Sequence, residues 1–388
     1  MAYYSIFPEK DATIYSHPNR TGLNTGRDEI LELLEETDSN KEIYYPSRFL
    51  IKFKNTEIKD VIENKLTGIA RAVKNETCQV CLEVFSTEHK ALHTDHIIQI
   101  QAISQSWDEG TGRYSNLPTS SNGCSWKFRN NTIKKDEWST DNFGTGGGTG
   151  SVVSSSLITA GGGTWYTGSD FRSSQQFLAG TSLDTNFDVT NIVKKHSASL
   201  FNGSLYPTGI FNNGFLIKKP DSVEMNVSHS FGQLQYFSVD THTIHPPKLI
   251  FKWDDSVHTL QSSAKQSGEL NVSLYRNREE YNQKDEAIFR IHVRDKYPTR
   301  QFTSTSNFLD VGYFTTSSFY SIRDAYSEQE IIPFDDDFTK LSADSEGMFF
   351  KLFMKGLQPE RYYRILFKHK NQDGTRVYDD NYLFKVVR

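Results

Sequence analysis

The chain has 388 residues, of which 36% are hydrophobic and 13% are aromatic, and its formal net charge at pH 7 is −5. This acidic balance, with no strongly basic stretch, argues against electrostatic binding to nucleic acid. No run of eighteen apolar residues occurs, so no membrane-spanning helix is expected, and residues 1–10 lack the apolar region of a secretion signal. Three sparse cysteines are typical of a chain that folds in a reducing cytoplasm.

Short strands are predicted in the first part of the chain, because β-branched and aromatic residues gather there between turn residues. Residues 28–36 remain open, since their apolar positions fit the period of a helix and that of a strand. Apolar residues at helical spacing predict a helix over 56–74. The predicted strands cover residues 12–16, 47–53, 80–84 and 98–102, and the loop between the last two holds His89, His93 and His96.

A long irregular region follows. From Asp108 to Gly163 the periodic signal fades, and residues 144–156 are almost wholly Gly, Thr, Ser and Val. This composition predicts a surface excursion, so we expect a Gly/Ser-rich insertion over about 113–163. Beyond it, the pattern predicts a short helix at 188–195 and strands at 214–218, 234–239 and 248–253.

The last part of the chain is predicted to be a separate β-sandwich. Polar residues 261–267 show no periodicity and mark a boundary between domains of residues 1–262 and 267–388. About seven strands over about 120 residues is the pattern of an immunoglobulin-like sandwich. The predicted strands include residues 269–275, 287–294, 348–354, 363–368 and 382–387, with a hairpin turn at 372–374 before the last one.

One motif supports this assignment. Leu357 and Pro359, in a Leu-x-Pro arrangement, precede Tyr363 at the start of a predicted strand. The pattern resembles the tyrosine corner of fibronectin type III and immunoglobulin-like domains, which implies that the Tyr363 hydroxyl binds a backbone group. The alternative is an ordinary loop before an ordinary strand.

Seven segments of the first domain follow one another in a characteristic order: residues 11–16 (DATIYS), 24–26 (NTG), 47–53 (SRFLIKF), 104–112 (SQSWDEGTG), 116–118 (NLP), 164–165 (TW) and 187–190 (FDVT). In this order they resemble the DNRLRE-type domain, a jelly-roll module of bacterial surface and carbohydrate-associated proteins. The helix at 56–74 and the Gly-rich stretch depart from that pattern as insertions, and the family's usual secretion signal is missing. The predicted fold class is therefore all-β, a jelly-roll-like β-sandwich with insertions followed by an immunoglobulin-like β-sandwich.

Three further segments carry a narrower resemblance: residues 107–115 (WDEGTGRYS), 243–249 (TIHPPKL) and 358–364 (QPERYYR). They are similar to virion structural proteins of marine T-even-like myophages, cyanophages included. The resemblance implies a particle assembled in the cytoplasm of a host bacterium, with this chain at the tail or baseplate. It also implies contacts with other virion proteins in several symmetric copies.

Cys78, Cys81, His93 and His96 combine the residue types of a zinc site. The two cysteines fall on a predicted strand at positions of opposite parity, so their side chains should point to opposite faces. A zinc knuckle instead needs both on a tight turn. We therefore favour buried free thiols and predict no metal or cofactor here.

An acidic run, Asp335-Asp336-Asp337, has the hard oxygen ligands that calcium prefers. Its spacing matches no calcium-binding loop. A solvated acidic turn is the favoured interpretation, because runs of charge are usually exposed, and the three residues remain weak metal candidates.

Aromatic residues in or beside the irregular region are candidates for stacking on sugars, since jelly-roll modules often bind glycans. Burial in the core is the competing interpretation. The candidates are Trp126, Trp138, Trp165 and Tyr166.

Structural roles are predicted for Arg48 and Trp107. Arg48 is flanked by strand hydrophobics, which favours a buried or stacked guanidinium. Trp107 begins a tight turn after a strand and is predicted to belong to the core.

No sequence motif for catalysis is present: there is no nucleophile elbow, no phosphate-binding glycine loop and no HExxH. We therefore expect a non-enzymatic structural protein of a phage tail or baseplate that acts through assembly. The alternative is an adhesin that binds host surface polysaccharide. A third possibility is a glycan-cleaving tail enzyme, which requires two carboxylates facing each other across a cleft.

Overall fold

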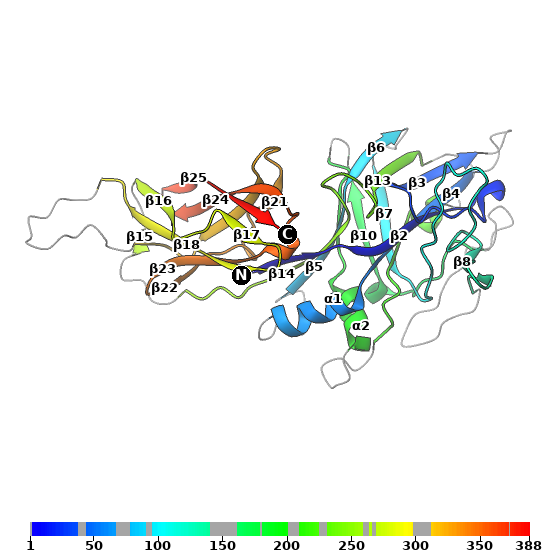
Figure 1. The fold of residues 1–388 in the computed structure, drawn as a ribbon, viewed down its shortest axis with the longest axis horizontal. Coiled ribbons are helices and arrows are strands. Elements are labelled where there is room, and N and C mark those ends of the chain that lie inside the picture. The colour runs from blue at the N-terminus through cyan, green and yellow to red at the C-terminus, as the bar shows by residue number, and fades with distance from the viewer. Residues whose placement is uncertain are drawn as a thin grey trace, which may run out of the picture. The chain divides into compact units, whose positions relative to one another are not determined.

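A computed structural model describes residues 2–37, 44–66, 78–90, 95–139, 161–178, 181–200, 209–224, 231–258, 264–265, 269–297, 312–371 and 373–388. Strands joined by loops dominate, with few short helices, so the predicted all-β sandwich class is confirmed (Figure 1). The chain forms two compact units, an N-terminal unit (Ile6–Ile250) and a C-terminal unit (Phe251–Arg388 with Met1–Ser5). The predicted boundary at 261–267 lies largely outside the described residues, and the Gly-rich stretch at 144–156 lies wholly outside them.

Eight strands form the main sheet of the N-terminal unit, in the order β10-β7-β12-β4-β3-β13-β6, with β2 paired to β4. Strand β4 is central, because it pairs with β2, β3 and β12, all antiparallel. Its residues Phe49, Leu50 and Ile51 are fully buried. The strands are β2 (Pro8–Tyr15), β3 (Ile30–Thr37), β4 (Tyr44–Phe53), β6 (Ser86–Lys90), β7 (His96–Ala102), β10 (Arg172–Phe177), β12 (Phe215–Lys218) and β13 (Gln233–Phe237).

A second sheet of this unit has the order β14-β5-β11. Cys78 and Cys81 both lie on β5 and are both buried, because this strand is covered on its two faces. The remaining elements are β5 (Cys78–Val84), β11 (Thr185–Asp188), β14 (Lys248–Trp253), the short pair β8 (Phe128–Asn130) and β9 (Asp136–Glu137), the helices α1 (Asn55–Asp60), α2 (Thr190–Leu200) and α3 (Asp221–Glu224), the π-turn η2 (Val61–Lys65), and the 3-10 turns η1 (Pro18–Arg20) and η4 (Ser169–Phe171).

Local sequence predictions fail or remain partial at three places. The ambiguous segment is strand β3, whose Leu31 and Leu33 are 1% and 0% exposed. The helix predicted at 56–74 is present as α1 and η2 up to Lys65, and residues 67–77 lie outside the described part. His89, predicted in a loop, lies in strand β6, whose polar sequence STEHK is an exposed sheet edge and so shows no apolar alternation.

The C-terminal unit consists of two sheets, β16-β18-β23-β22 and β17-β25-β24-β20-β21. Taken in order across each sheet, these strands correspond to strands A-B-E-D and A′-G-F-C-C′ of an immunoglobulin-like sandwich. The strands are β16 (Leu270–Tyr275), β17 (Glu280–Asn282), β18 (Glu286–Asp295), β20 (Ser318–Asp324), β21 (Glu330–Ile332), β22 (Ser342–Asp344), β23 (Gly347–Phe353), β24 (Arg361–Asn371) and β25 (Gly374–Val387). The unit also contains β1 (Ala2–Ile6), the pair β15 (Ala264–Lys265) and β19 (Tyr313–Phe314), and the turn η5 (Met354–Gly356).

Aromatic rings join the two sheets of this sandwich. Tyr320 of β20 stacks on Phe350 of β23 with ring centroids 4.2 Å apart. Phe289 of β18 lies 5.2 Å from Phe384 of β25 and 5.1 Å from Phe350. These rings pack against one another between the sheets and contribute to the core of the sandwich.

The corner before β24 has the predicted bond. The Tyr363 hydroxyl donates to the Gln358 carbonyl at 2.9 Å, and the Tyr363 side chain is 2% exposed. Pro359 lies inside the loop that this bond closes. The motif therefore ties the start of strand F to the preceding turn, as in immunoglobulin-like domains.

Replacing Tyr363 by Phe should lower the opening free energy of this corner by about 1 kcal/mol, because the Gln358 carbonyl loses its donor. Hydrogen exchange of amides in β24 measures the effect in the full chain. Tyr362→Phe is the matched control, since the neighbouring ring is 38% exposed. Equal protection in the two variants would contradict a structural role for this bond.

Candidate functional site

The four aromatic residues predicted as a sugar platform are buried. Trp126, Trp138 and Trp165 are 0%, 4% and 2% exposed, and Tyr166 is 6% exposed. The three tryptophans share a core cluster with Trp107, whose indole donates to the Asn213 carbonyl at 2.8 Å. Stacking on a sugar needs an open ring face, so the platform prediction was wrong, whereas Trp107 is a core residue as predicted.

Two of these rings hold a buried guanidinium. Arg48 on β4 is 0% exposed and lies 4.8 Å from the Trp126 ring and 5.1 Å from the Trp165 ring. Its Nη2 is 2.7 Å from a carboxylate oxygen of Glu224, and its Nη1 donates to the Gly162 carbonyl at 2.7 Å. Arg48 is therefore both stacked and paired, and its predicted structural role is confirmed.

Glu224 is shared by two cations. The Lys218 ammonium lies 3.0 Å from Glu224 and 2.5 Å from Asp221, and it also donates to the Lys219 carbonyl at 2.8 Å. The side chains of Lys218 and Glu224 are 1% and 0% exposed. This cluster is a buried, hydrogen-bonded ion network that orders the core and cannot be reached by a ligand.

The predicted metal candidates have other partners. Asp335 accepts the backbone N–H groups of Asp337 and Phe338 at 2.8 and 3.0 Å, which caps the acidic turn. Asp336 pairs with Lys370 and Lys368, and these ammonium groups lower the pKa of Asp336. Among the described residues, no three His, Cys, Asp or Glu side chains are grouped to hold a metal ion.

The described residues of the Cys/His set are likewise buried or stacked on another side chain. Burial, together with the nearby Cys81, raises the pKa of the Cys78 thiol to about 12. His96 stacks on Phe177 with centroids 4.9 Å apart. His93 lies outside the described residues.

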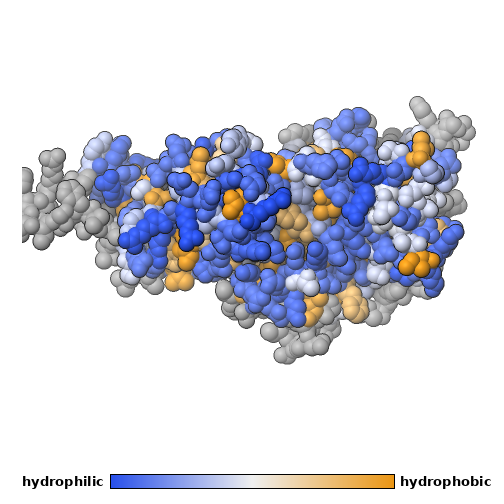
Figure 2. All heavy atoms as spheres, viewed as in Figure 1, coloured by the Kyte–Doolittle hydropathy of each residue, from blue (hydrophilic) through white to orange (hydrophobic). Residues whose placement is uncertain are grey.

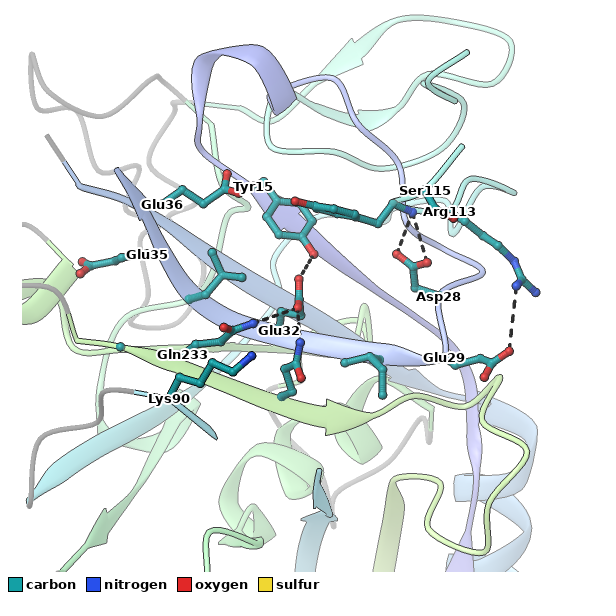
Figure 3. A pocket seen from close by; sticks show the side chains of 15 residues that line it. Tyr15, Asp28, Glu29, Glu32, Glu35, Glu36, Lys90, Arg113, Ser115 and Gln233 are labelled. Atoms are coloured by element: carbon teal, nitrogen blue, oxygen red, sulfur yellow. Dashed lines mark hydrogen bonds and ion pairs between the residues drawn. The ribbon is translucent and has the colours of Figure 1, made fainter. Parts of the chain in front are cut away.

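A polar pocket of about 770 Å³ opens on the N-terminal unit, beside the outer face of β3 (Figure 3). Its side chains include five carboxyl groups and only two cations, so the lining is acidic. The pocket is lined by Tyr15, Asp28, Glu29, Ile30, Glu32, Leu34, Glu35, Glu36, Lys90, Arg113, Tyr114, Ser115, Gly232, Gln233 and Gln235.

Glu32 forms the centre of the pocket, and within the described part of the chain its carboxylate accepts hydrogen bonds from neutral groups. It accepts from the Tyr15 hydroxyl at 2.5 Å and from the side-chain amides of Gln235 and Gln233 at 2.7 and 3.4 Å (Figure 3). Burial and the adjacent Glu32 charge raise the pKa of Tyr15 well above its usual value, so its hydroxyl remains a donor. The negative charge of Glu32 is thus oriented but not neutralised.

Two hydroxyl groups fix the backbone beneath Glu32. Thr13 on β2 accepts the Glu32 N–H at 3.1 Å. Ser47 on β4 donates to the Glu32 carbonyl at 2.8 Å and accepts the Leu34 N–H at 2.9 Å. The floor of the pocket is therefore held by side chains of two paired strands, β2 and β4, and does not depend on a loop.

The wall opposite β3 carries Tyr114, whose ring is 42% exposed. The Tyr114 N–H donates to both carboxylate oxygens of Asp28, at 3.0 and 3.2 Å. The buried amide of Asn24 holds the preceding loop, since it donates to the Glu109 and Cys124 carbonyls and accepts the Gly112 N–H at 2.8 Å. A loop that looks irregular in sequence is thereby made rigid.

Sequence reasoning did not find this pocket. The available signal was the alternation within β3, where Leu31 and Leu33 face the core while Glu32 and Glu36 face outward with the pocket-lining residues. That signal was hidden because the segment also fits a helix. The partners from β13 and from residues 113–115 are more than 75 positions distant and carry no motif.

Comparisons with known proteins identify no relative of the chain. No family model matches it, and no curated protein matches it. Among solved structures, the β-glucuronidase of Parabacteroides merdae is similar at 9% identity and a TM-score of 0.15, covering 96% of this chain and 36% of that enzyme. The chain thus spans little more than a third of that enzyme, and such a TM-score does not relate the two folds. No described helix has the length and apolar character needed to cross a membrane.

Glu224→Gln should destabilise the N-terminal unit by about 3 kcal/mol or more, because Arg48 and Lys218 would remain buried without their shared carboxylate. Urea unfolding followed by tryptophan fluorescence reports on this unit, which contains Trp107, Trp126, Trp138 and Trp165. Glu63→Gln is the control, since its side chain is 48% exposed. Similar midpoints for the two variants would contradict the structural importance of the buried network.

The pH dependence of the unfolding free energy should reveal the raised pKa of Asp28. Burial raises the pKa of Asp28 to about 6, above its unfolded value of about 4. The folded state therefore binds the proton more tightly, so Asp28 makes folding less favourable as pH rises from 4 to 7. We expect the unfolding free energy of Asp28→Asn, relative to that of the wild type, to increase as the pH rises over this range. Parallel pH profiles in urea titrations would contradict the raised pKa.

Proposed function

We propose that this chain is a non-enzymatic structural component of a bacteriophage virion, a tail or baseplate adaptor that acts through protein–protein assembly. The resemblance of residues 107–115, 243–249 and 358–364 to myophage virion proteins motivates the proposal. The observation that carries the assembly mechanism is a surface of the C-terminal unit with the composition of a protein interface.

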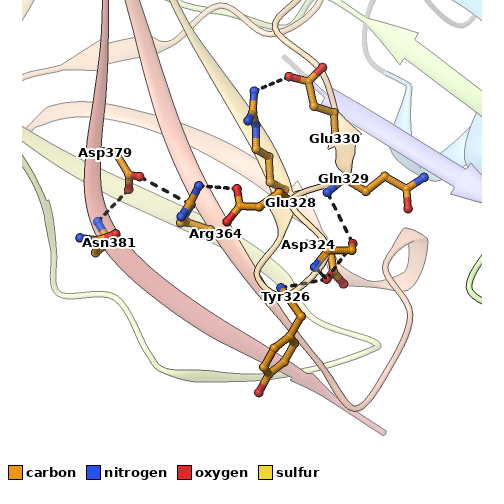
Figure 4. A network of polar contacts seen from close by, with 10 residues as sticks. Asp324, Tyr326, Glu328, Gln329, Glu330, Arg364, Asp379 and Asn381 are labelled. Atoms are coloured by element: carbon orange, nitrogen blue, oxygen red, sulfur yellow. Dashed lines mark hydrogen bonds and ion pairs between the residues drawn. The ribbon is translucent and has the colours of Figure 1, made fainter.

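This surface, called here the Tyr326–Tyr362 surface, consists of Tyr326, Tyr362, Arg364 and Leu383. Figure 4 shows Tyr326 and Arg364 with their polar contacts. The two tyrosine rings meet edge to face at 6.1 Å and are 77% and 38% exposed. Arg364 and the 45% exposed Leu383 are directly paired across β24 and β25. Tyrosine and arginine are the side chains most enriched where proteins bind one another.

The loop that presents Tyr326 is held in place by a buried carboxylate. Asp324 is 1% exposed and accepts the N–H groups of Tyr326 and Ser327 at 3.0 and 2.9 Å (Figure 4). It also pairs with Arg361 at 2.6 Å. Arg364 is held between Glu328 and Asp379. A surface ordered before contact loses less conformational entropy on docking, which favours assembly.

Two cysteines and one histidine, residue types that often perform covalent or proton-transfer chemistry, are buried here, which fits a non-enzymatic role. Burial raises the pKa values of Cys78 and Cys124, so both thiols stay protonated. Burial lowers the pKa of His196 to about 3, which keeps that imidazole neutral. The face in Figure 2 is mainly hydrophilic with scattered hydrophobic residues, a texture that suits docking through small mixed contacts.

A second candidate function is glycan binding, and the pocket at Glu32 is the observation that favours it. Its volume of about 770 Å³ falls in the usual range for small-ligand sites. Hydroxyl-rich ligands need fixed acceptors beside an aromatic face, and Glu32 and Tyr114 supply these two features. The two candidate functions use different units and are compatible in one virion protein.

The assembly proposal predicts that Tyr326→Ser with Tyr362→Ser lowers incorporation into particles about tenfold or more, since interface tyrosines are frequent hot spots. Quantitative mass spectrometry of purified virions measures the copies retained. Tyr297→Ser is the matched control, because Tyr297 is also exposed, at 76%, but follows β18 of the other sheet. Absence of the wild-type chain from purified particles would contradict the virion proposal; equal incorporation of all three would contradict this docking surface.

A further inference from the structure

We propose that the pocket at Glu32 is a saccharide site that selects by charge: it takes sugars bearing a free amine most tightly, neutral sugars less tightly, and excludes acidic sugars. This inference rests on the glycan-binding candidate above and specifies the class of ligand. It is carried by the cavity, its aromatic wall and its uncompensated carboxylate.

The pocket has a fixed shape before any ligand arrives. Its floor is strand β3, held through Thr13 and Ser47, and its second side is β13, paired to β3 with Gln235 opposite Glu32. Its wall is the loop at Tyr114, anchored by Asp28. Preorganisation of this kind reduces the entropic cost of binding a small polar ligand.

The hydrogen-bonding groups suit a polyhydroxylated ligand. Glu32 already accepts from Tyr15, Gln235 and Gln233, and because a carboxylate accepts about four hydrogen bonds, it keeps capacity for a ligand donor. Gln233 contributes an amide that both donates and accepts. Tyr114 is 42% exposed, and its aromatic side chain offers a surface against which a sugar can pack beside the Arg20 guanidinium, which stacks 4.6 Å from the ring centroid. The Tyr15 ring lies 5.5 Å from the same ring.

The charges of the pocket set its selectivity. The two cations that line the pocket already have partners, since Arg113 lies 4.0 Å from Glu29 and Lys90 lies 3.1 Å from Glu88. Arg20, next to the Tyr114 ring, pairs with Glu36. Among the residues that the structure describes, the hydrogen-bond partners of Glu32 are neutral. An ammonium group on a sugar would supply the missing positive charge, whereas a carboxylate or sulfate would add repulsion in a partly desolvated site.

Titration calorimetry of the full chain with three oligosaccharides of equal length tests the proposal. The probes are oligomers of glucosamine, N-acetylglucosamine and glucuronic acid, which carry positive, neutral and negative groups. We expect the glucosamine oligomer to bind about tenfold tighter than the neutral one, a preference that added salt reduces, and no binding of the acidic one. Acidic binding equal to neutral binding would overturn the charge selection and leave glycan binding intact.

Two variants locate the site. Glu32→Gln should abolish the preference for the amine and leave the neutral affinity within about twofold, whereas Tyr114→Ala should weaken both by about tenfold. Glu63→Gln and Tyr297→Ala are controls of the same chemistry on exposed positions. Unchanged affinities in both pocket variants, with cooperative unfolding retained, would overturn the assignment of the site. Binding of none of the three sugars would overturn this inference and the glycan-binding candidate together, without affecting the assembly proposal.

Discussion

A guanidinium shielded from water connects four separate parts of the N-terminal unit. Arg48 on β4 is stacked by Trp126 and Trp165, bonded to the Gly162 carbonyl and paired with Glu224. Burying such a charge is costly unless every donor has a partner, so these segments must come together for the core to form. Gly162 is required there, because it has φ of 83° and a Cβ would lie 2.7 Å from the Arg48 guanidinium.

The same strand links this network to the pocket. Ser47 precedes Arg48, and alternation along β4 sends its side chain the opposite way, to the backbone of β3 beneath Glu32. The strand that anchors the core therefore also positions the floor of the pocket. Asn24 does the equivalent for the wall, because its one amide fixes the loop from Glu109 to Gly112. Buried polar groups thus replace regular hydrogen-bond ladders where the chain is irregular.

In the C-terminal unit too, buried polar side chains fix irregular segments of the backbone, although fewer of them are involved. The Tyr363 hydroxyl ties the strand to its preceding turn, and Asp324 caps the loop that presents Tyr326. Both devices lie on the sheet whose outer face carries Tyr362 and Leu383. Interior polar bonds therefore order an exposed, interface-like surface, which links the architecture of this unit to the proposed role in assembly.

Sequence by itself determined the all-β class, the tyrosine corner at Tyr363 and the buried character of Arg48, because each depends on local pattern or on neighbours within a few positions. It left open whether the four candidate aromatic side chains are exposed or buried, because the residue type alone does not determine the surroundings of a Trp or a Tyr. Only the tertiary structure decided that Glu32, Gln235 and Tyr114 line one pocket. The physical reason is that β3 and β13 pair across two hundred residues, and strand register over such a separation is fixed by side-chain packing that no local sequence pattern records.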